Sequence, residues 1–221
     1  MRAQNFPLAA SALGVLITFA GTSPVQADWE LSFYTGFQSA PHSRVKGDAN
    51  GTDFNFLAEW EGRPFEAPPY YGFRATYWKS PTFGWGVDFN HTKVYATDDT
   101  LADSGFDDLE LTDGLNILTL NAYRRWPSEE RKWTPYVGGG LGLSIPHVDA
   151  EFAGSNTFEY QITGPAAAWM AGVTYPLNEN WSVFGEYKGT FSSNDASLEG
   201  GGSLKTNIIT NALNIGVSYG F

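Results

Sequence analysis

The chain has no cysteine, few basic residues and no apolar run long enough to cross a bilayer as a helix. The absence of cysteine excludes disulfides, thiolate metal sites and thiol nucleophiles. Only 13 of the 221 residues are Lys or Arg, against 24 Asp or Glu, so the net charge is -11 at pH 7. So acidic a chain lacks the cations that phosphate contacts require, which excludes a nucleic-acid partner. Nucleotide-binding glycine motifs and the HExxH zinc motif are also missing.

Aromatic residues, by contrast, are plentiful. The chain holds 8 Trp, 11 Tyr and 16 Phe, together 16% of its residues, yet its mean hydropathy is -0.26. A helical membrane protein has long apolar runs, and a soluble domain seldom carries so many Trp and Tyr residues. This combination calls for an architecture in which apolar and polar residues alternate.

The first 27 residues are predicted to be a secretory signal peptide. Arg2 gives a positive start, Leu8 to Ala20 is apolar, and Val25-Gln26-Ala27 has the small-x-small pattern of a cleavage site. The apolar stretch is shorter than the ~20 residues that a membrane-spanning helix needs. Residues 28–221 are then expected to form one domain.

Apolar and polar residues alternate with a period of two along eight segments of this domain. In one of them Trp85, Val87 and Phe89 alternate with glycine and polar residues. The segments lie at about 29–38, 70–79, 84–90, 115–125, 133–147, 167–175, 181–188 and 213–221. Each is long enough to cross a bilayer at a tilt.

The connections between these segments alternate in length. Short turns lie at 80–83, 127–132 and 176–180, and long polar stretches at roughly 40–69, 97–114, 148–164 and 192–204. This layout predicts an all-β fold, an eight-stranded antiparallel up-and-down transmembrane β-barrel with long extracellular loops and both ends in the periplasm. Segment 54–60 also alternates; a ninth spanning strand would be an odd number, so we expect a hairpin above the membrane there.

The residue types on the two faces support a membrane barrel over a soluble one. Opposite the apolar faces lie glycines and the charged residues Arg74, Asp88, Glu186 and Lys188, which suit a narrow polar interior and are expected to pair as ions. Aromatic residues also flank the short turns, where a membrane–water girdle belongs. They are Trp78, Trp85, Trp126, Trp133, Tyr175 and Trp181.

The three histidines are the candidates for chemistry. His42, His91 and His147 each fall at the loop-side end of an outward-running strand. Together with Asp149, which follows His147, they could bind a metal ion. Histidine is also common at a membrane–water boundary, and the three strands are not neighbours, so this alternative stays open.

Two basic residues are candidates for binding lipid phosphate. Strict alternation places His91 and Lys93 on the lipid-facing side, and the lipid of the outer leaflet is phosphorylated lipopolysaccharide. Lys93 and Arg44 are therefore expected to bind phosphate as cations, the alternative for Lys93 being a lysine that snorkels at a strand end. The seven acidic residues between 98 and 113 could bind divalent cations that bridge such phosphates, although a solvated acidic loop is the simpler interpretation.

Six segments of the chain are distinctive in sequence. They are FYTGFQSAPHS (33–43), PPYYGFRATYW (68–78), GVDFNHTKVY (86–95), IPHV (145–148), GPAAAW (164–169) and GEYKG (185–189). Together they resemble the outer-membrane lipid A oxidase family of rhizobia and related bacteria, across essentially all of residues 28–221. The resemblance implies an enzyme of the bacterial outer membrane that oxidises the proximal glucosamine of 1-dephosphorylated lipid A to 2-aminogluconate with O2, releasing H2O2.

Such an O2-dependent oxidoreductase needs a base for the sugar hydroxyl proton, and histidine suits that role. Reaction with O2 usually also needs a metal or a flavin, and without a nucleotide motif a divalent metal is the expected cofactor. We therefore expect His42, His91 and His147 to form the site. The alternative is a non-enzymatic small barrel that serves as an anchor or a surface-interaction protein. A pore is disfavoured, because side chains fill an eight-stranded interior.

Overall fold

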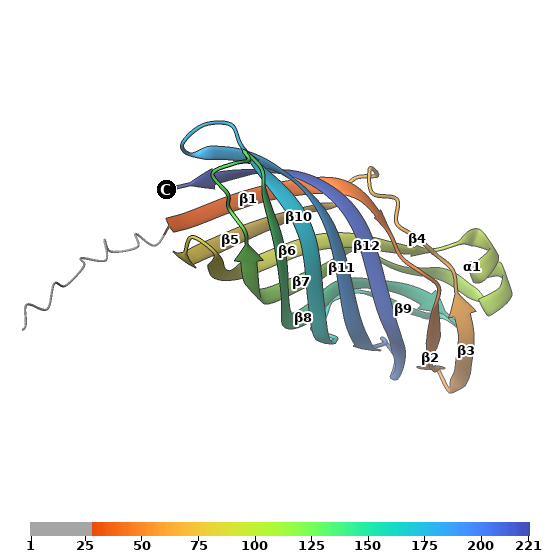
Figure 1. Ribbon diagram of the computed structural model, residues 1–221. Helices are drawn as coiled ribbons and strands as arrows, with labels where there is room; N and C mark the ends of the chain where they lie inside the picture. The colour runs from red at the N-terminus through yellow and green to blue at the C-terminus, as the bar shows by residue number, and fades with distance from the viewer. Residues whose placement is uncertain (1–27) are drawn as a thin grey trace, which may run out of the picture.

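Eight antiparallel strands close into a ring in the computed structural model, which describes residues 28–221 apart from the side chains at positions 112 and 113 (Figure 1). The predicted signal peptide lies outside these residues. The ring closes because β12 pairs with both β11 and β1. Its strands are β1 (Asp28–Ser39), β5 (Tyr71–Ser80), β6 (Phe83–Ala96), β7 (Phe106–Arg125), β8 (Thr134–Phe152), β10 (Gly164–Pro176), β11 (Trp181–Ser197) and β12 (Gly202–Gly220).

These eight strands match the eight predicted segments to within one residue at the ends of the segments that extend beyond them, and the short turns lie where the sequence predicts them. The first and last described strands meet at the end of the ring that carries these turns, where the backbone N–H of Phe221 donates to the Trp29 carbonyl at 2.9 Å. Among residues 28–221, no helix has both the length and the apolar character to cross a membrane.

The stretches predicted as long polar loops are mostly strand, so that prediction is wrong. The hairpin of β2 (Ser43–Ala49) and β3 (Thr52–Ala58) pairs with β12, and this confirms the hairpin expected around residues 54–60. Ring strands extend into the other stretches, which also hold β4 (Trp60–Glu61), β9 (Ser155–Tyr160) and the helix α1 (Asp98–Ser104). Many outward-facing residues of these segments are polar, although Leu57, Phe158 and Tyr160 are exposed, so the apolar alternation is weaker than in the ring.

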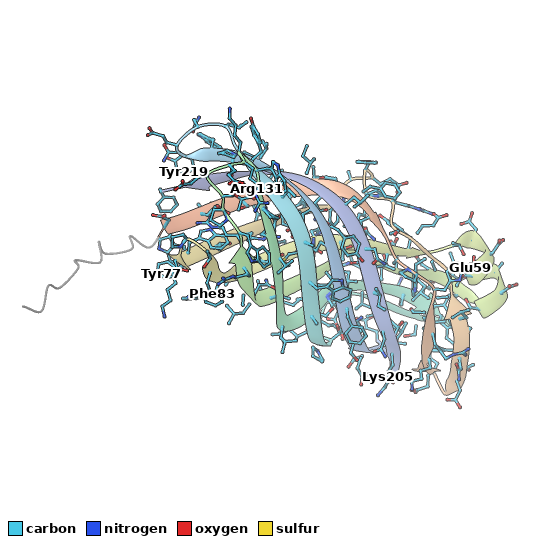
Figure 2. The ribbon with its side chains drawn as sticks, in the orientation of Figure 1. Glu59, Tyr77, Phe83, Arg131, Lys205 and Tyr219 are labelled. Carbon is cyan, nitrogen blue, oxygen red and sulfur yellow. The ribbon has the colours of Figure 1, made fainter. Side chains whose placement is uncertain are left out.

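Apolar side chains face outward on the ring and most polar ones face inward. On β7, Leu118 and Leu120 are exposed while Thr119 and Asn121 are buried. Tyr77, Phe83 and Tyr219 gather at the end that carries the termini (Figure 2). Five of the six girdle residues are exposed, but Trp78 points into the ring, where the Arg125 guanidinium lies 3.7 Å from its ring centroid.

The interior of the ring contains two layers and a cavity. A polar cluster lies in the middle, and an apolar core, which includes Phe54, Phe106 and Phe152, lies towards the end with the β2–β3 hairpin. At the end with the short turns, a cavity of about 500 Å³ reaches inward as far as Arg74.

Candidate functional site

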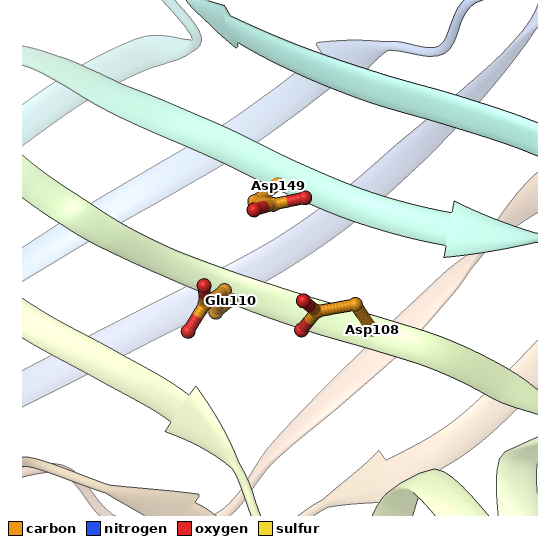
Figure 3. A group of neighbouring side chains, drawn as sticks. All are labelled: Asp108, Glu110 and Asp149. Carbon is orange, nitrogen blue, oxygen red and sulfur yellow. The ribbon is translucent and has the colours of Figure 1, made fainter.

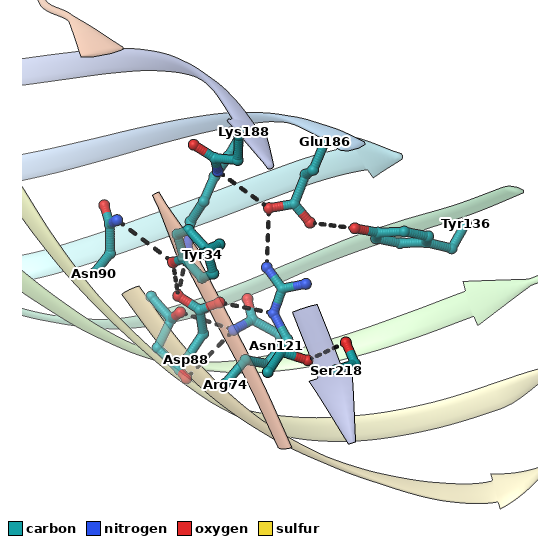
Figure 4. A network of polar contacts seen from close by, with 12 residues as sticks. Tyr34, Arg74, Asp88, Asn90, Asn121, Tyr136, Glu186, Lys188 and Ser218 are labelled. Atoms are coloured by element: carbon teal, nitrogen blue, oxygen red, sulfur yellow. Dashed lines mark hydrogen bonds and ion pairs between the residues drawn. The ribbon is translucent and has the colours of Figure 1, made fainter. Parts of the chain in front are cut away.

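The polar cluster brings four charged side chains together (Figure 4). Arg74 of β5 donates from Nε to Asp88 at 2.8 Å and from Nη2 to Glu186 at 3.0 Å. The Lys188 ammonium donates to the other oxygen of Asp88. All four side chains are almost fully buried, which confirms the predicted interior ion pairs.

Tyrosines complete the cluster. The Tyr34 hydroxyl donates to Asp88 at 2.9 Å and accepts from Lys188 at 2.6 Å, while the Tyr136 hydroxyl donates to Glu186 at 2.8 Å. Each charge is therefore compensated by an opposite charge and by hydrogen bonds, as buried ions require. This arrangement favours a structural role, because the bonded side chains link opposite walls of the ring.

His91 lies in a second cluster, on the outward face of the wall. Its ring stacks on Tyr71 of β5, with centroids 4.8 Å apart and planes at 17°, and its Nδ1 lies 2.9 Å from the Asn116 Oδ1 of β7. Gly114, whose φ is 112°, lies so close that a Cβ there would overlap the His91 ring. His91 is only 4% exposed.

The pairing register places His91 on the outward face of the ring, the side that is predicted to face lipid. His91 pairs with Tyr71, and two residues along the same strands Phe89 pairs with the exposed Phe73. Residues that are directly opposite on neighbouring strands share a face. His91 thus lies at the outer end of the apolar surface of β5 and β6, where the neighbouring side chains cover it.

The prediction that Lys93 is exposed to lipid is wrong, although the residue lies on the predicted outward face. Val94 and Ala96 belong to the interior apolar core, so alternation continues along β6, yet the Lys93 side chain is fully buried beneath the segment between β4 and β5. The ammonium donates to the Glu66 carbonyl at 2.9 Å and lies 5.0 Å from the Tyr95 ring centroid.

Gln38 connects two strands that are not neighbours in the ring. Its Nε2 donates to the Lys93 carbonyl at 2.9 Å, and its Oε1 accepts from the Lys93 backbone N–H at 3.2 Å. The amide joins β1 to β6 just beyond Tyr71, where the intervening β5 begins. Sequence reasoning missed this contact, since no local pattern signals a bond between residues 55 positions apart.

The other two histidines lie elsewhere. His42 is exposed, and its Nδ1 is 3.8 Å from a Glu59 carboxylate oxygen. His147 of β8 is buried against Phe158 and Tyr160, with ring centroids 4.3 and 4.7 Å away. The structure therefore does not bring the three predicted histidines into one group.

Among the side chains that the structure describes, one group of three or more His, Asp and Glu residues could hold a metal ion, and it contains no histidine. Asp108 and Glu110 of β7 face Asp149 of β8, with one ligand atom from each all lying within 4.8 Å of one another (Figure 3). Partial burial raises the pKa of Asp108. The all-carboxylate set suits a hard divalent cation such as Ca²⁺ or Mg²⁺, and it includes the predicted ligand Asp149.

Arg44, the second predicted phosphate ligand, lies on the β2–β3 hairpin outside the ring. Its side chain is exposed and donates from Nη1 to Asn55 Oδ1 at 2.8 Å. Arg44 is thus exposed on the hairpin, whereas Lys93 is buried on β6.

Comparisons with known proteins agree with this architecture. The model of the family described as outer membrane protein beta-barrel domain matches residues 12–221. Among solved structures, OprG from Pseudomonas aeruginosa is 15% identical with a TM-score of 0.54, over 88% of this chain and 96% of that chain. The outer membrane protein AlkL is 16% identical with a TM-score of 0.54, over 100% and 97%. No curated protein matches the sequence. The chain therefore belongs to the outer-membrane protein beta-barrel domain family and is a protein of the bacterial outer membrane.

Proposed function

We propose that this barrel is a lipid A oxidase that converts the proximal glucosamine of 1-dephosphorylated lipid A to 2-aminogluconate. One observation carries the proposal. Three of the six segments that resemble the lipid A oxidase family meet at a single place, where Tyr71 stacks on His91 and Gln38 binds the backbone of Lys93. These segments lie on three different strands, so their meeting depends on the fold.

The position of His91 suits a lipid substrate. It lies on the outward face, at the outer end of the exposed surface formed by Phe73 and Leu118. With the strand extensions outside the cell, that level is where the sugars of outer-leaflet lipid A would lie. A sugar could then reach His91 from the bilayer when its covering neighbours move.

The tautomer of His91 suits a general base. The Asn116 Oδ1 can only accept, so Nδ1 carries the ring proton of neutral His91 and Nε2 is the basic nitrogen. In the proposed reaction Nε2 takes the proton of the anomeric hydroxyl. The C1–H bond gives its electron pair to O2, which takes up two protons in all to become H2O2. The lactone that forms adds water and opens to 2-aminogluconate.

The carboxylates Asp108, Glu110 and Asp149 would hold the divalent metal that we expect for this protein. When bound there, such an ion would neutralise acidic groups beside a phosphorylated lipid. His42 and His147 stay candidate catalytic residues that are to be tested beside His91.

The test is mass spectrometry of lipid A from cells that remove the 1-phosphate. Deleting the gene should abolish aminogluconate, and wild-type protein should restore it. His91→Ala should lower the rate by at least about 100-fold, the usual minimum for loss of a general base. His42→Ala and His147→Ala, measured at equal amounts of folded barrel, show whether His91 acts alone. An unchanged aminogluconate fraction after deletion would refute the proposal and favour a non-enzymatic barrel.

A further inference from the structure

Three cations gather on one face of the sheet where the β2–β3 hairpin joins β12. Lys46 of β2 and Lys205 of β12 are direct cross-strand partners. Arg44 lies two residues before Lys46 and therefore on the same face. We call Arg44, Lys46 and Lys205 the basic patch. All three side chains are exposed.

The basic patch faces away from the interior. Val45 and Leu204, the sequence neighbours of these cations, are buried in the apolar core. Further along the same face of β12 lie Ile209 and Leu213, which are 41% and 67% exposed. Lys205 lies four residues beyond Ile209, about 13 Å along the strand. The basic patch is therefore just past the apolar surface, at the level of lipid headgroups. Figure 2 shows Lys205 far from the end that carries Tyr77 and Tyr219.

The charges of the basic patch are only partly compensated. Like charges directly opposite each other on neighbouring strands destabilise a sheet. Asp195 binds the Lys205 ammonium at 2.8 Å, and Arg44 donates to the neutral amide of Asn55. Among the described side chains, no carboxylate forms an ion pair with Lys46. An anion between Lys46 and Lys205 would relieve their repulsion.

We propose that the basic patch docks a phosphate group of lipid A in the outer leaflet. Lysine ammonium groups bind phosphate as point charges, and the arginine guanidinium can bind it through two parallel hydrogen bonds. Positive charge stands out on a chain whose net charge is -11. The basic patch lies on β2 and β12 whereas His91 lies on β6, so docking does not depend on the proposed oxidation.

The test measures binding of bisphosphorylated lipid A to the purified full-length barrel in detergent. Removing both lysines, in Lys46→Gln/Lys205→Gln, should weaken binding by about 25-fold, since each cation near an anionic surface contributes about fivefold. Lys79→Gln, which removes an exposed lysine at the opposite end, is the matched control and should bind like wild type. Lys46→Arg/Lys205→Arg should also retain binding.

Two further measurements make the test specific. Asp195→Asn removes the carboxylate that competes for Lys205 and should tighten binding, which also tests the proposal if the double variant does not fold. Lipid A without phosphates should bind wild type and the double variant equally weakly. The proposal is overturned if the double variant binds the bisphosphorylated lipid as tightly as wild type. Docking is measured as binding of the lipid and oxidation as the aminogluconate fraction, so failure of docking and failure of the oxidase proposal are distinguishable.

Discussion

Tyr34 occupies the centre of the polar cluster, and its place depends on a residue with no side chain. Its ring packs over Gly72 of β5, where a Cβ would overlap the phenol ring. From there the hydroxyl reaches both Asp88 and Lys188. Gly72 therefore gives Tyr34 the space to connect two buried charges.

We expect Gly72→Ala to displace Tyr34 and to lower the free energy of unfolding by about 1–3 kcal/mol, the usual cost of leaving buried polar groups unsatisfied. Gly185→Ala is the control, because a Cβ there meets nothing within 4 Å. Urea unfolding in lipid vesicles, followed by tryptophan fluorescence, measures both. Equal midpoints for the two variants would contradict this role of Gly72.

The inward direction of Arg74 and Asp88 was predictable, because strand alternation fixes the face of each residue. The burial of Lys93 was not, since the segment that covers it, which includes Glu66, lies far from it in sequence. The contact of Gln38 with Lys93 arises because β1 and β6 flank β5, which starts late. Local periodicity contains neither piece of information, and it does not determine which histidines meet.

At the scale of elements, aromatic packing anchors the β2–β3 hairpin. The ring of Phe54 on β3 packs edge-on against Phe106 of β7 and Phe152 of β8. The ring centroids are 5.1 and 5.2 Å apart. The hairpin thus packs against two ring strands in addition to pairing with β12.

Removing this ring, in Phe54→Ala, should destabilise the outer part of the protein by about 3–5 kcal/mol, as is usual for a buried phenylalanine. We expect protease to cut the hairpin of the variant while the ring strands stay intact. Phe65→Ala removes a phenylalanine that is 75% exposed and should cause no change. Cleavage at wild-type rates in Phe54→Ala would show that the hairpin does not depend on this contact.

The spanning strands were predictable because lipid on one side and a narrow interior on the other force alternation. Beyond the bilayer the outer face meets water, and polar residues there remove the apolar signal. In β2, for example, Val45 is buried between exposed Arg44 and Lys46, and this sequence resembles a polar loop.

The carboxylates between β7 and β8 should make the stability of the protein depend on pH. Burial raises the pKa of Asp108 above 3.8, so the folded protein disfavours its charged form. That cost is present above the raised pKa and disappears as the pH falls below 3.8, where the group is protonated in both states. Without divalent ions, Asp108→Asn should therefore raise the thermal midpoint at pH 7 and have no effect near pH 3.

Asp107→Asn, at an exposed neighbouring position, is the control for this prediction. Added Ca²⁺ should stabilise wild type more than Asp108→Asn, because the ion needs the carboxylate. A difference between wild type and Asp108→Asn that does not change from pH 7 to pH 3 would contradict the assignment.

At the scale of the whole molecule, the polar cluster and the apolar core block the interior. We expect planar bilayers that contain the protein to show no steady conductance, unlike an open porin in the same bilayer. Replacing Tyr34, Arg74 and Lys188 together with alanine should increase ion flow if the variant folds. A steady current proportional to voltage in the wild type would contradict a filled interior.

The four buried charges also have a consequence for assembly. Arg74 and Asp88 lie on the adjacent strands β5 and β6, while Glu186 and Lys188 lie two residues apart on β11, about 100 positions later. The strands β5 and β6 thus bring one positive and one negative charge to the cluster. Strand β11 likewise brings one of each. The β5–β6 pair and β11 can both enter the bilayer without net charge from these residues, and on closure Arg74 and Asp88 keep their bond to each other and gain partners across the ring. Insertion of β5 and β6 into the bilayer is therefore possible before β11 joins them.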